Sequence, residues 1–171
     1  IIGRGTVRNG WGRAACCGHF GDDWLTRTVV NFGGIWANVF EEVVYYKGNV
    51  DSSGEKLDPA QVYTLTFPAT DLPSNYAKYF WSVIALDAVH RRVLPNPLNR
   101  FLVNNQSDLT FAEDGSLTLY FAAERPDDAP EGNWLPTIGQ SLSFTFRFYG
   151  PRGGVVDGAY FPPPIIRRSV A

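Results

Sequence analysis

Residues 141–149, SLSFTFRFY, alternate between apolar and polar side chains from one end to the other. Phe144, Phe146 and Phe148 fall on one side of an extended chain, whereas Thr145 and Arg147 fall on the other. A period of two residues is typical of a strand with one face in a core. This stretch therefore predicts an amphipathic strand and a mainly β fold.

The same pattern recurs on the N-terminal side of this strand. Residues 62–67 alternate, and residues 79–87 are apolar on nearly both faces, as in an interior strand. Residues 108–124 place an Asp-Gly turn ahead of another alternating run. Because 17 Gly and 12 Pro punctuate the chain and no helical crossover separates these runs, we expect an antiparallel β-sandwich of jelly-roll type.

One amphipathic helix is expected near the N-terminus, within residues 21–38. Apolar side chains recur at helical spacing, and two aspartates precede them. Asp22 is the expected N-cap, and Asp23 would lie at the favourable end of the helix dipole. The spaced apolar residues are Leu25, Val29, Phe32 and Trp36. Because the segment has weak helix formers, we expect its apolar stripe to pack on a partner surface.

The expected organisation is a single domain over residues 1–171. Residues 1–38 would hold a lead-in and the helix, residues 39–150 the β-sandwich, and residues 151–171 an extended proline-rich arm that straps over the domain. The chain opens on Ile1 without the charged and apolar regions of a signal peptide. We expect that a leader or a larger N-terminal part has been removed.

Composition excludes several classes of partner. The formal net charge of −2 provides no basic footprint for a phosphate backbone, so nucleic acid is not expected as a partner. No apolar run approaches the roughly 20 residues that cross a bilayer, so no membrane span is expected.

No metal or cofactor is expected. Cys16, Cys17 and His19 lie close together, but adjacent cysteines make no framework disulfide and the only other histidine is His90. Glycine-rich phosphate loops and a Gly-x-Ser-x-Gly nucleophile motif are also absent. Cys16 and Cys17 are better explained as small apolar side chains.

Residues 93–100, VLPNPLNR, form a rigid polar stretch between two apolar runs. The two prolines restrict the backbone, and the amides of Asn96 and Asn99 can bond backbone groups that lack ladder partners. This stretch predicts a locked crossing between strands, with the alternative that Asn99 and Arg100 line a pocket. Residues 132–136, GNWLP, are its expected companion and present Trp134 as an exposed side chain.

Several motifs in a fixed order resemble one bacterial family. They are FGDDWLTR, YFWSVIALD, LPNPLNR, DGSLTLYF, NWLP, FTFRFYGP and DGAYFPPPI. Together they resemble the domain of unknown function family 1214, which accompanies family 1254 as the C-terminal domain of longer proteins. The resemblance covers the chain from about Trp11 to Ile166. DAVHRRV at residues 87–93 departs from the family's usual Asp-x-Asp-Gly turn.

The resemblance implies a jelly-roll β-sandwich, likened to carbohydrate-active domains and frequent in exported or periplasmic proteins. It implies no settled activity. The location expected from it is therefore periplasmic or extracellular. The polar positions carried over from the family pattern are Arg27, Asp87, Asn96, Asn99, Arg100, Asn133, Trp134 and Arg147.

Three functions follow as hypotheses. The first is a non-catalytic binding or assembly module, half of a two-domain exported protein or a homo-oligomeric subunit, that recognises a saccharide through Trp134, Tyr149 and asparagine amides. The second is a hydrolase or lyase on a polysaccharide or small polar substrate, with Asp87 and Arg100 in one cleft. The third is a structural surface or coat subunit. The candidate ligand-binding residues are Asn96, Asn99, Arg100, Asn133, Trp134 and Arg147.

Overall fold

A computed structural model describes residues 5–15, 17–34 and 38–169 of the chain. Most of its secondary structure is β, with short helices between the strands. The strands are β1 (Gly5–Arg8), β2 (Trp11–Ala14), β3 (Val43–Gly48), β4 (Tyr63–Phe67), β5 (Ala77–Leu86), β6 (Leu102–Asn104), β7 (Leu117–Ala122), β8 (Trp134–Pro136), β9 (Ser143–Pro151) and β10 (Ile166–Arg167). The helices are α1 (Trp24–Gly33) and α2 (Gly154–Asp157), with 3₁₀ turns η1 (Ala69–Asp71), η2 (Pro73–Tyr76) and η3 (Glu131–Asn133).

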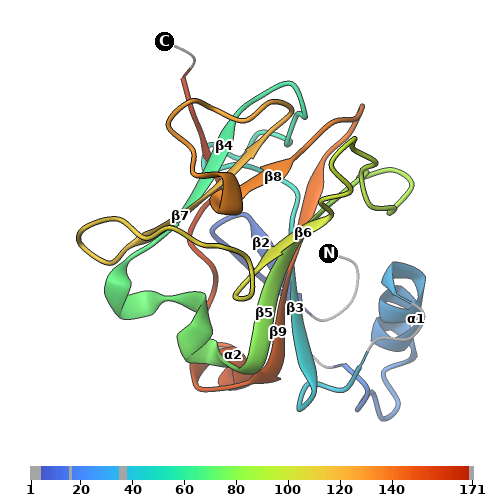
Figure 1. Ribbon diagram of the computed structural model, residues 1–171. Helices are drawn as coiled ribbons and strands as arrows, with labels where there is room; N and C mark the ends of the chain where they lie inside the picture. Colours follow the sequence, from blue (N-terminus) through green and yellow to red (C-terminus); the bar gives the residue numbers. More distant parts are fainter. Residues whose placement is uncertain (1–4, 16, 35–37, 170–171) are drawn as a thin grey trace.

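The strands form two sheets, which Figure 1 shows as two layers. One sheet has six strands in the order β1-β2-β3-β9-β5-β6, and the other has four in the order β10-β4-β7-β8. The described pairs are antiparallel except β7 with β8, which run parallel. The expected all-antiparallel pattern is wrong at this pair, because residues 123–133 carry the chain back to the starting end of β7 before β8 begins.

The core lies between the two sheets, and β9 supplies its centre. Phe144, Phe146 and Phe148 are fully buried, as their alternation predicts. Phe146 contacts Phe67 of the opposite sheet at 5.8 Å between ring centroids, and Phe144 contacts Phe121 at 4.3 Å. The mainly β class with two sheets is confirmed, whereas the sandwich of jelly-roll type remains a prediction.

The N-terminal lead-in is more ordered than expected, because it contains the hairpin β1–β2. Its turn is Asn9-Gly10, with φ of 55° and 80°. Both central residues of a tight two-residue hairpin turn need positive φ, which Asn and Gly adopt most readily. β2 then pairs with β3 and extends the six-stranded sheet.

Helix α1 exists where it was predicted, but its cap and its packing differ. It begins one residue later than expected, so Asp23 rather than Asp22 is the N-cap and accepts from Thr26 N at 3.0 Å. The expected burial of the apolar stripe is wrong for Leu25 and Phe32, which are 58% and 74% exposed. The Phe32 ring is covered by the Arg91 guanidinium at 4.1 Å instead of by a core. Trp36 lies outside the described residues.

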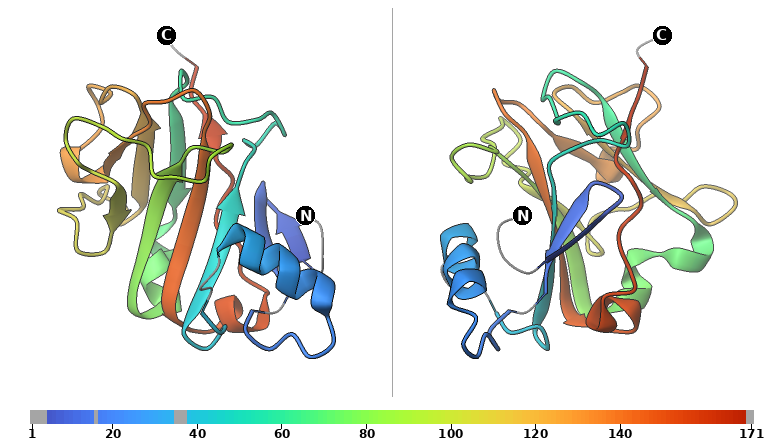
Figure 2. Two further views of the ribbon diagram at one scale, coloured as in Figure 1. Left: turned by 90° about the vertical axis from the view of Figure 1, so that its right-hand side faces the viewer. Right: turned by 180° about the vertical axis from the view of Figure 1, so that it is seen from behind.

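The C-terminal arm runs beside the β1–β2 hairpin and then joins the opposite sheet, as the right-hand view of Figure 2 shows. Trp11 Nε1 donates to the carbonyl of Pro163 at 2.8 Å, and Asn9 Nδ2 donates to that of Pro162 at 3.1 Å. β10 then pairs with β4. The arm therefore connects the edge of one sheet to the edge of the other.

Candidate functional site

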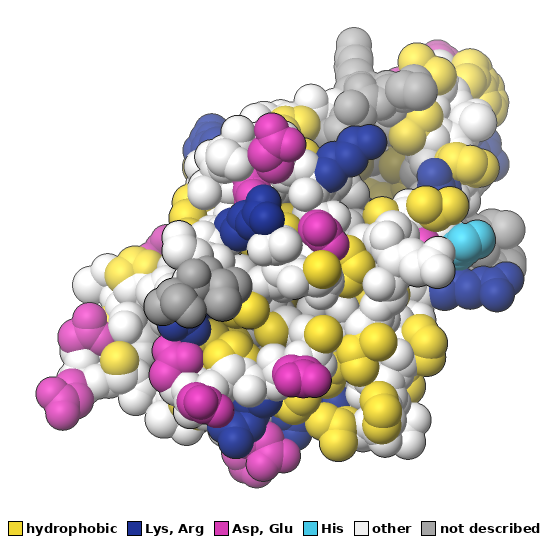
Figure 3. Space-filling model, turned by 90° about the horizontal axis from the view of Figure 1, so that it is seen from above, with side chains coloured by type: hydrophobic (Ala, Val, Ile, Leu, Met, Phe, Trp, Pro, Cys, Tyr) yellow, Lys and Arg dark blue, Asp and Glu magenta, His cyan; other side chains and the backbone are white. Residues whose placement is uncertain are grey.

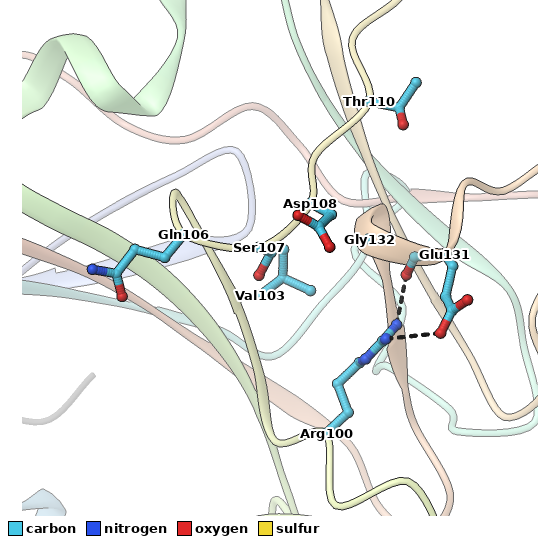
Figure 4. Close-up of a pocket in the computed structure, with 8 residues that line it drawn as sticks. All are labelled: Arg100, Val103, Gln106, Ser107, Asp108, Thr110, Glu131 and Gly132. Atoms are coloured by element: carbon cyan, nitrogen blue, oxygen red, sulfur yellow. Dashed lines mark hydrogen bonds and ion pairs between the residues drawn. The ribbon is translucent and has the colours of Figure 1, made fainter.

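An open pocket of about 550 Å³ lies where the chain between β6 and β7 faces the η3 turn. Pockets of roughly 300–1,000 Å³ are typical of small-molecule sites. Figure 4 shows Arg100 on one side of the pocket, linked to Glu131 of the turn. The lining residues are Arg100, Val103, Gln106, Ser107, Asp108, Thr110, Glu131 and Gly132. We refer to this cavity as the Arg100 pocket.

The guanidinium of Arg100 is held by the η3 turn. Nη1 donates to the carbonyl of Glu131 at 2.5 Å and to that of Trp134 at 3.2 Å, and Nη2 donates to Glu131 Oε1 at 3.2 Å. These bonds use three of the five N–H groups of the side chain. The guanidinium is thus oriented by the protein and keeps donor capacity for a ligand.

The rigid stretch 93–100 explains why Arg100 reaches this position. The side chain of Asn96 clamps the backbone of Arg100, because Oδ1 accepts from Arg100 N at 3.1 Å and Nδ2 donates to Arg100 O at 2.9 Å. Asn99 turns the chain with a φ of 51°, and its N–H donates to Asn96 O at 3.1 Å. The predicted backbone bonding is therefore confirmed for Asn96, whereas Asn99 acts through its backbone conformation and N–H.

Asn133 does not line the pocket but supports it from behind. It is 2% exposed, and its Oδ1 accepts from Thr110 N at 2.8 Å. Its Nδ2 donates to the carbonyls of Thr110 at 2.7 Å and Thr118 at 2.8 Å. The amide therefore joins the η3 turn to β7 and to the loop that precedes it.

Trp134 also lies behind the pocket. The expected exposure is wrong, since the side chain is 8% exposed and its Nε1 donates to the carbonyl of Ala122 at 3.0 Å. Parallel pairing of β8 with β7 draws the indole into the protein. Arg100 covers the ring from the pocket side, with 5.9 Å from Cζ to the ring centroid.

The two walls approach each other closely at Gly132. A Cβ at this position would lie 1.8 Å from the carbonyl oxygen of Asp108, so only glycine allows the contact. On the facing loop, Asn104 Oδ1 accepts from Gln106 N at 2.9 Å and lies 3.2 Å from Ser107 Oγ. These local bonds order the loop that carries the polar side chains of the pocket.

The lining combines acceptors and donors. Two carboxylates, Asp108 and Glu131, and the hydroxyl of Thr110 are exposed at the rim, and buried Val103 lies beneath. The guanidinium balances one of the two carboxylates, so the side chains of the pocket favour a neutral or weakly cationic ligand over an anion.

Asp87 belongs to a different region and organises its own loop. Its Oδ1 accepts from the N–H groups of Val89 and His90, each at 2.8 Å, and from Ser141 Oγ at 2.8 Å. The hydrogen bond from the backbone of His90, followed by those from Ser141 and from the His90 side chain, holds the pKa of Asp87 well below its usual range. Arg91 takes a φ of 57° in this loop, a conformation that residues other than glycine rarely adopt.

Two further arginines from the sequence prediction also lie apart from the Arg100 pocket. Arg147 lies on the outer face of the six-stranded sheet, where Nε donates to Ser82 Oγ at 2.8 Å and Cζ lies 5.6 Å from the Tyr149 ring. Arg27 is on α1 with its Cζ 5.7 Å from the Trp24 ring. Of the predicted site residues, the structure brings Arg100, Asn133 and Trp134 together, with Asn96 bracing Arg100.

The described part of the chain does not offer a metal site. Among those residues, no three His, Cys, Asp or Glu side chains are grouped so that they could hold a metal ion. His19 instead lies 3.3 Å from Glu41, Cys17 is buried, and Cys16 is outside the described residues. No described helix has the length and apolar character of a membrane span. The face in Figure 3 intersperses basic with acidic side chains.

Sequence reasoning missed the residues that form most of the pocket surface. Gln106, Ser107, Asp108, Thr110 and Glu131 all lie in loops or turns. The signal that was available is the polar run NNQSD at residues 104–108, directly after an apolar segment. Polar loops on a rigid scaffold commonly carry binding residues.

Comparison with known proteins places the chain in a family. Residues 42–153 match the model of a family described as a protein of unknown function, DUF1214. The chain belongs to the DUF1214 family. The matched range contains the Arg100 pocket and β3 through β9. The companion family 1254 domain remains a prediction, and no curated protein matches the chain.

Two solved structures are similar to this DUF1214 chain. The VPA0106 protein from Vibrio parahaemolyticus is 28% identical, with a TM-score of 0.70, and the match covers 84% of this chain and 35% of that chain. An uncharacterized protein from Burkholderia cenocepacia is 20% identical, with a TM-score of 0.49, over 74% of this chain and 29% of that chain. The chain therefore spans about a third of the length of these solved relatives.

Proposed function

We propose that this DUF1214 domain is a non-catalytic binding module that takes a neutral saccharide unit in the Arg100 pocket. The observation that carries the proposal is the orientation of one guanidinium beside an open, polar cavity of about 550 Å³. Sugar hydroxyls donate and accept hydrogen bonds, so they require a lining that offers both.

The side chains of the pocket match this requirement. Arg100 and Gln106 supply donors, and Asp108, Glu131 and Thr110 supply acceptors around the same cavity. An oriented side chain loses less conformational freedom when it binds, which favours affinity. Because Trp134 is buried, hydrogen bonds rather than stacking on that indole would hold the sugar.

The binding role is favoured over the hydrolase or lyase alternative by the position of Asp87. A catalytic acid and Arg100 would have to face the same substrate. The carboxylate of Asp87 instead accepts hydrogen bonds from its own loop and from Ser141. The lining of the Arg100 pocket contains no histidine, cysteine or lysine, and one of its two carboxylates, that of Glu131, is paired with Arg100.

The test is a titration of the ¹⁵N-labelled protein with glucose, galactose, mannose and N-acetylglucosamine, followed by amide chemical shifts. We expect saturable shifts at Gln106, Ser107 and Gly132 with at least one sugar. Asp108→Asn removes a charged acceptor from the rim and should weaken that sugar at least tenfold, about 1.4 kcal/mol. Arg100→Lys should weaken it similarly because an ammonium lacks the planar fork.

Two substitutions of the same chemistry outside the pocket serve as controls. Asp127→Asn changes an exposed loop carboxylate, and Arg147→Lys changes the outer face of the sheet. Both should retain the affinity of the unaltered protein. Saturable binding that is unaffected by Asp108→Asn and Arg100→Lys, or shifts that stay linear with all four sugars, would refute the proposal.

A further inference from the structure

A second cavity, of about 340 Å³, lies where the β1–β2 turn, the η1 and η2 turns and the C-terminal arm meet. It shares no lining residue with the Arg100 pocket. The lining residues are Arg8, Asn9, Asp71, Tyr76, Gly154, Ala159, Tyr160 and Phe161. We refer to it as the Tyr160 cavity.

The hydroxyl of Tyr160 is a buried polar group without a partner among the described residues. The side chain is 7% exposed, and its Oη makes no hydrogen bond there. The ring is fixed from two sides, because its centroid lies 4.0 Å from that of the Tyr76 ring and 5.7 Å from that of the Phe148 ring. Burying a polar group unpaired costs stability, so a rigid, unpaired hydroxyl in a cavity lining points to a ligand.

Asp71 and Tyr76 place further polar atoms at the same cavity. The Tyr76 hydroxyl donates to Asp71 Oδ1, so Oδ2 of the carboxylate can still accept. The hydrogen bond to Asp71, followed by burial, raises the pKa of Tyr76 to about 12, so its phenol stays protonated at neutral pH. Burial raises the pKa of Tyr160, and the charge of Asp71 raises it further.

The geometry points to a ligand that carries a primary ammonium group: we propose that the Tyr160 cavity binds a small monoamine through Asp71, Tyr76 and Tyr160. An ammonium has three N–H donors, and Asp71 Oδ2 and the two phenol oxygens are acceptors. The carboxylate supplies the opposite charge. A carboxylate ligand would instead meet Asp71 as a like charge.

Arg8 limits the charge of that ligand. Its Nη1 donates to the carbonyl of Ala159 at 2.9 Å, and its Cζ lies 4.9 Å from the Phe161 ring at the edge of the cavity. A second positive charge that extended from the Asp71 side toward this edge of the cavity would be repelled by the fixed guanidinium. The cavity therefore favours a monoamine over a polyamine.

The experiment is a titration of the ¹⁵N-labelled chain with n-butylammonium chloride and, at equal ionic strength, with sodium butyrate. We expect saturable shifts of the Gly154 and Ala159 amides with butylammonium and none with butyrate. Asp71→Asn should weaken butylammonium at least tenfold because it removes the charge. Tyr160→Phe should weaken it severalfold because it removes one acceptor.

Tyr160→Phe also separates a ligand role from a structural one. Because the deleted hydroxyl has no partner in the described structure, the variant should melt at the same temperature as the unaltered protein or higher when no amine is present. If Asp71→Asn does not fold, the amine affinity of Tyr160→Phe tests the proposal by itself. Equal binding of butyrate, absence of saturable shifts, or undiminished amine binding by Tyr160→Phe would overturn the proposal.

Discussion

At the residue scale, polar side chains that look available in the sequence are mostly used by the backbone. The amide of Asn133 makes three hydrogen bonds to main-chain groups, and the carboxylate of Asp87 accepts two from main-chain N–H groups. Irregular segments lack ladder partners, so nearby side chains satisfy their N–H and C=O groups. Arg100 differs because it is oriented by such bonds and still faces a cavity.

Asp87→Asn is expected to change the acid stability of the protein. The folded structure depresses the pKa of Asp87 below its ordinary 3.8, so the ionised carboxylate stabilises the fold above roughly pH 4. That contribution declines as the pH falls below this value and through the depressed one. Melting temperatures between pH 7 and pH 2 should show the variant less stable at neutral pH, with the difference closing in acid.

Asp127→Asn, at an exposed loop position, is the matched control for this series. It should follow the unaltered protein at every pH. A gap between the Asp87→Asn variant and the unaltered protein that stayed constant down to pH 2 would contradict the role given to ionised Asp87.

At the scale of elements, α1 is attached to the domain more loosely than the strands. Thr26 is the one buried side chain among its ten residues, whereas β9 places Phe144, Phe146 and Phe148 in the core. Isolated helices of this length are marginal in water, so the cap and a few contacts must support it. We expect α1 to open locally without unfolding the sheets.

Asp23→Ala should weaken α1 selectively. Loss of the bond to Thr26 N removes about 1 kcal/mol from the helix, which corresponds to roughly fivefold faster amide exchange in α1. The midpoint of global unfolding should change little, because the apolar side chains Leu25 and Phe32 are already exposed. Hydrogen exchange measured by NMR and urea unfolding provide the two readouts.

Asp22→Ala is the control for the cap, since Asp22 immediately precedes the capping residue and its side chain is exposed. Exchange in α1 should be unchanged in this variant. If Asp22→Ala accelerated exchange and Asp23→Ala did not, the cap would lie where the sequence pattern alone placed it.

At the scale of the whole molecule, one row of aromatic side chains connects both sheets. Phe146 lies within 6.2 Å, between ring centroids, of Trp11 and Trp81 in its own sheet and of Phe67 in the other. Folding is therefore expected to be cooperative, with this row as the common contact of both layers.

Phe146→Ala should destabilise the entire domain by about 3–5 kcal/mol, the usual cost of a cavity at a buried phenylalanine. Since domains of this size are stable by only about 5–15 kcal/mol, the urea midpoint should fall steeply. Phe111→Ala, at a side chain that is 47% exposed, should cost less than about 1 kcal/mol. Equal losses in the two variants would contradict the central position of Phe146.

Much of the fold was predictable because strand alternation is a local property of the extended backbone. Phe144, Phe146 and Phe148 are buried as their spacing predicts, and Tyr63, Leu65 and Phe67 behave alike in β4. The β1–β2 hairpin was missed although Asn9-Gly10 is a strong local signal for it. β8 and β10 were missed for another reason. Segments of three and two residues are too short to show an alternating pattern, and they become strands only because the edges of β7 and β4 lie beside them.

By itself, the sequence determined which side chains of the alternating strands enter the core and that Arg100 follows a stiff, amide-clamped approach, because both depend on neighbours along the chain. Only the tertiary structure decided the sites. The Arg100 pocket joins residue 100, the loop 103–110 and the η3 turn, and the Tyr160 cavity joins both ends of the chain with the η1 and η2 turns. Which segments come together at these two cavities depends on how the sheets pack and on which backbone groups still need hydrogen-bond partners. No local sequence pattern encodes either property.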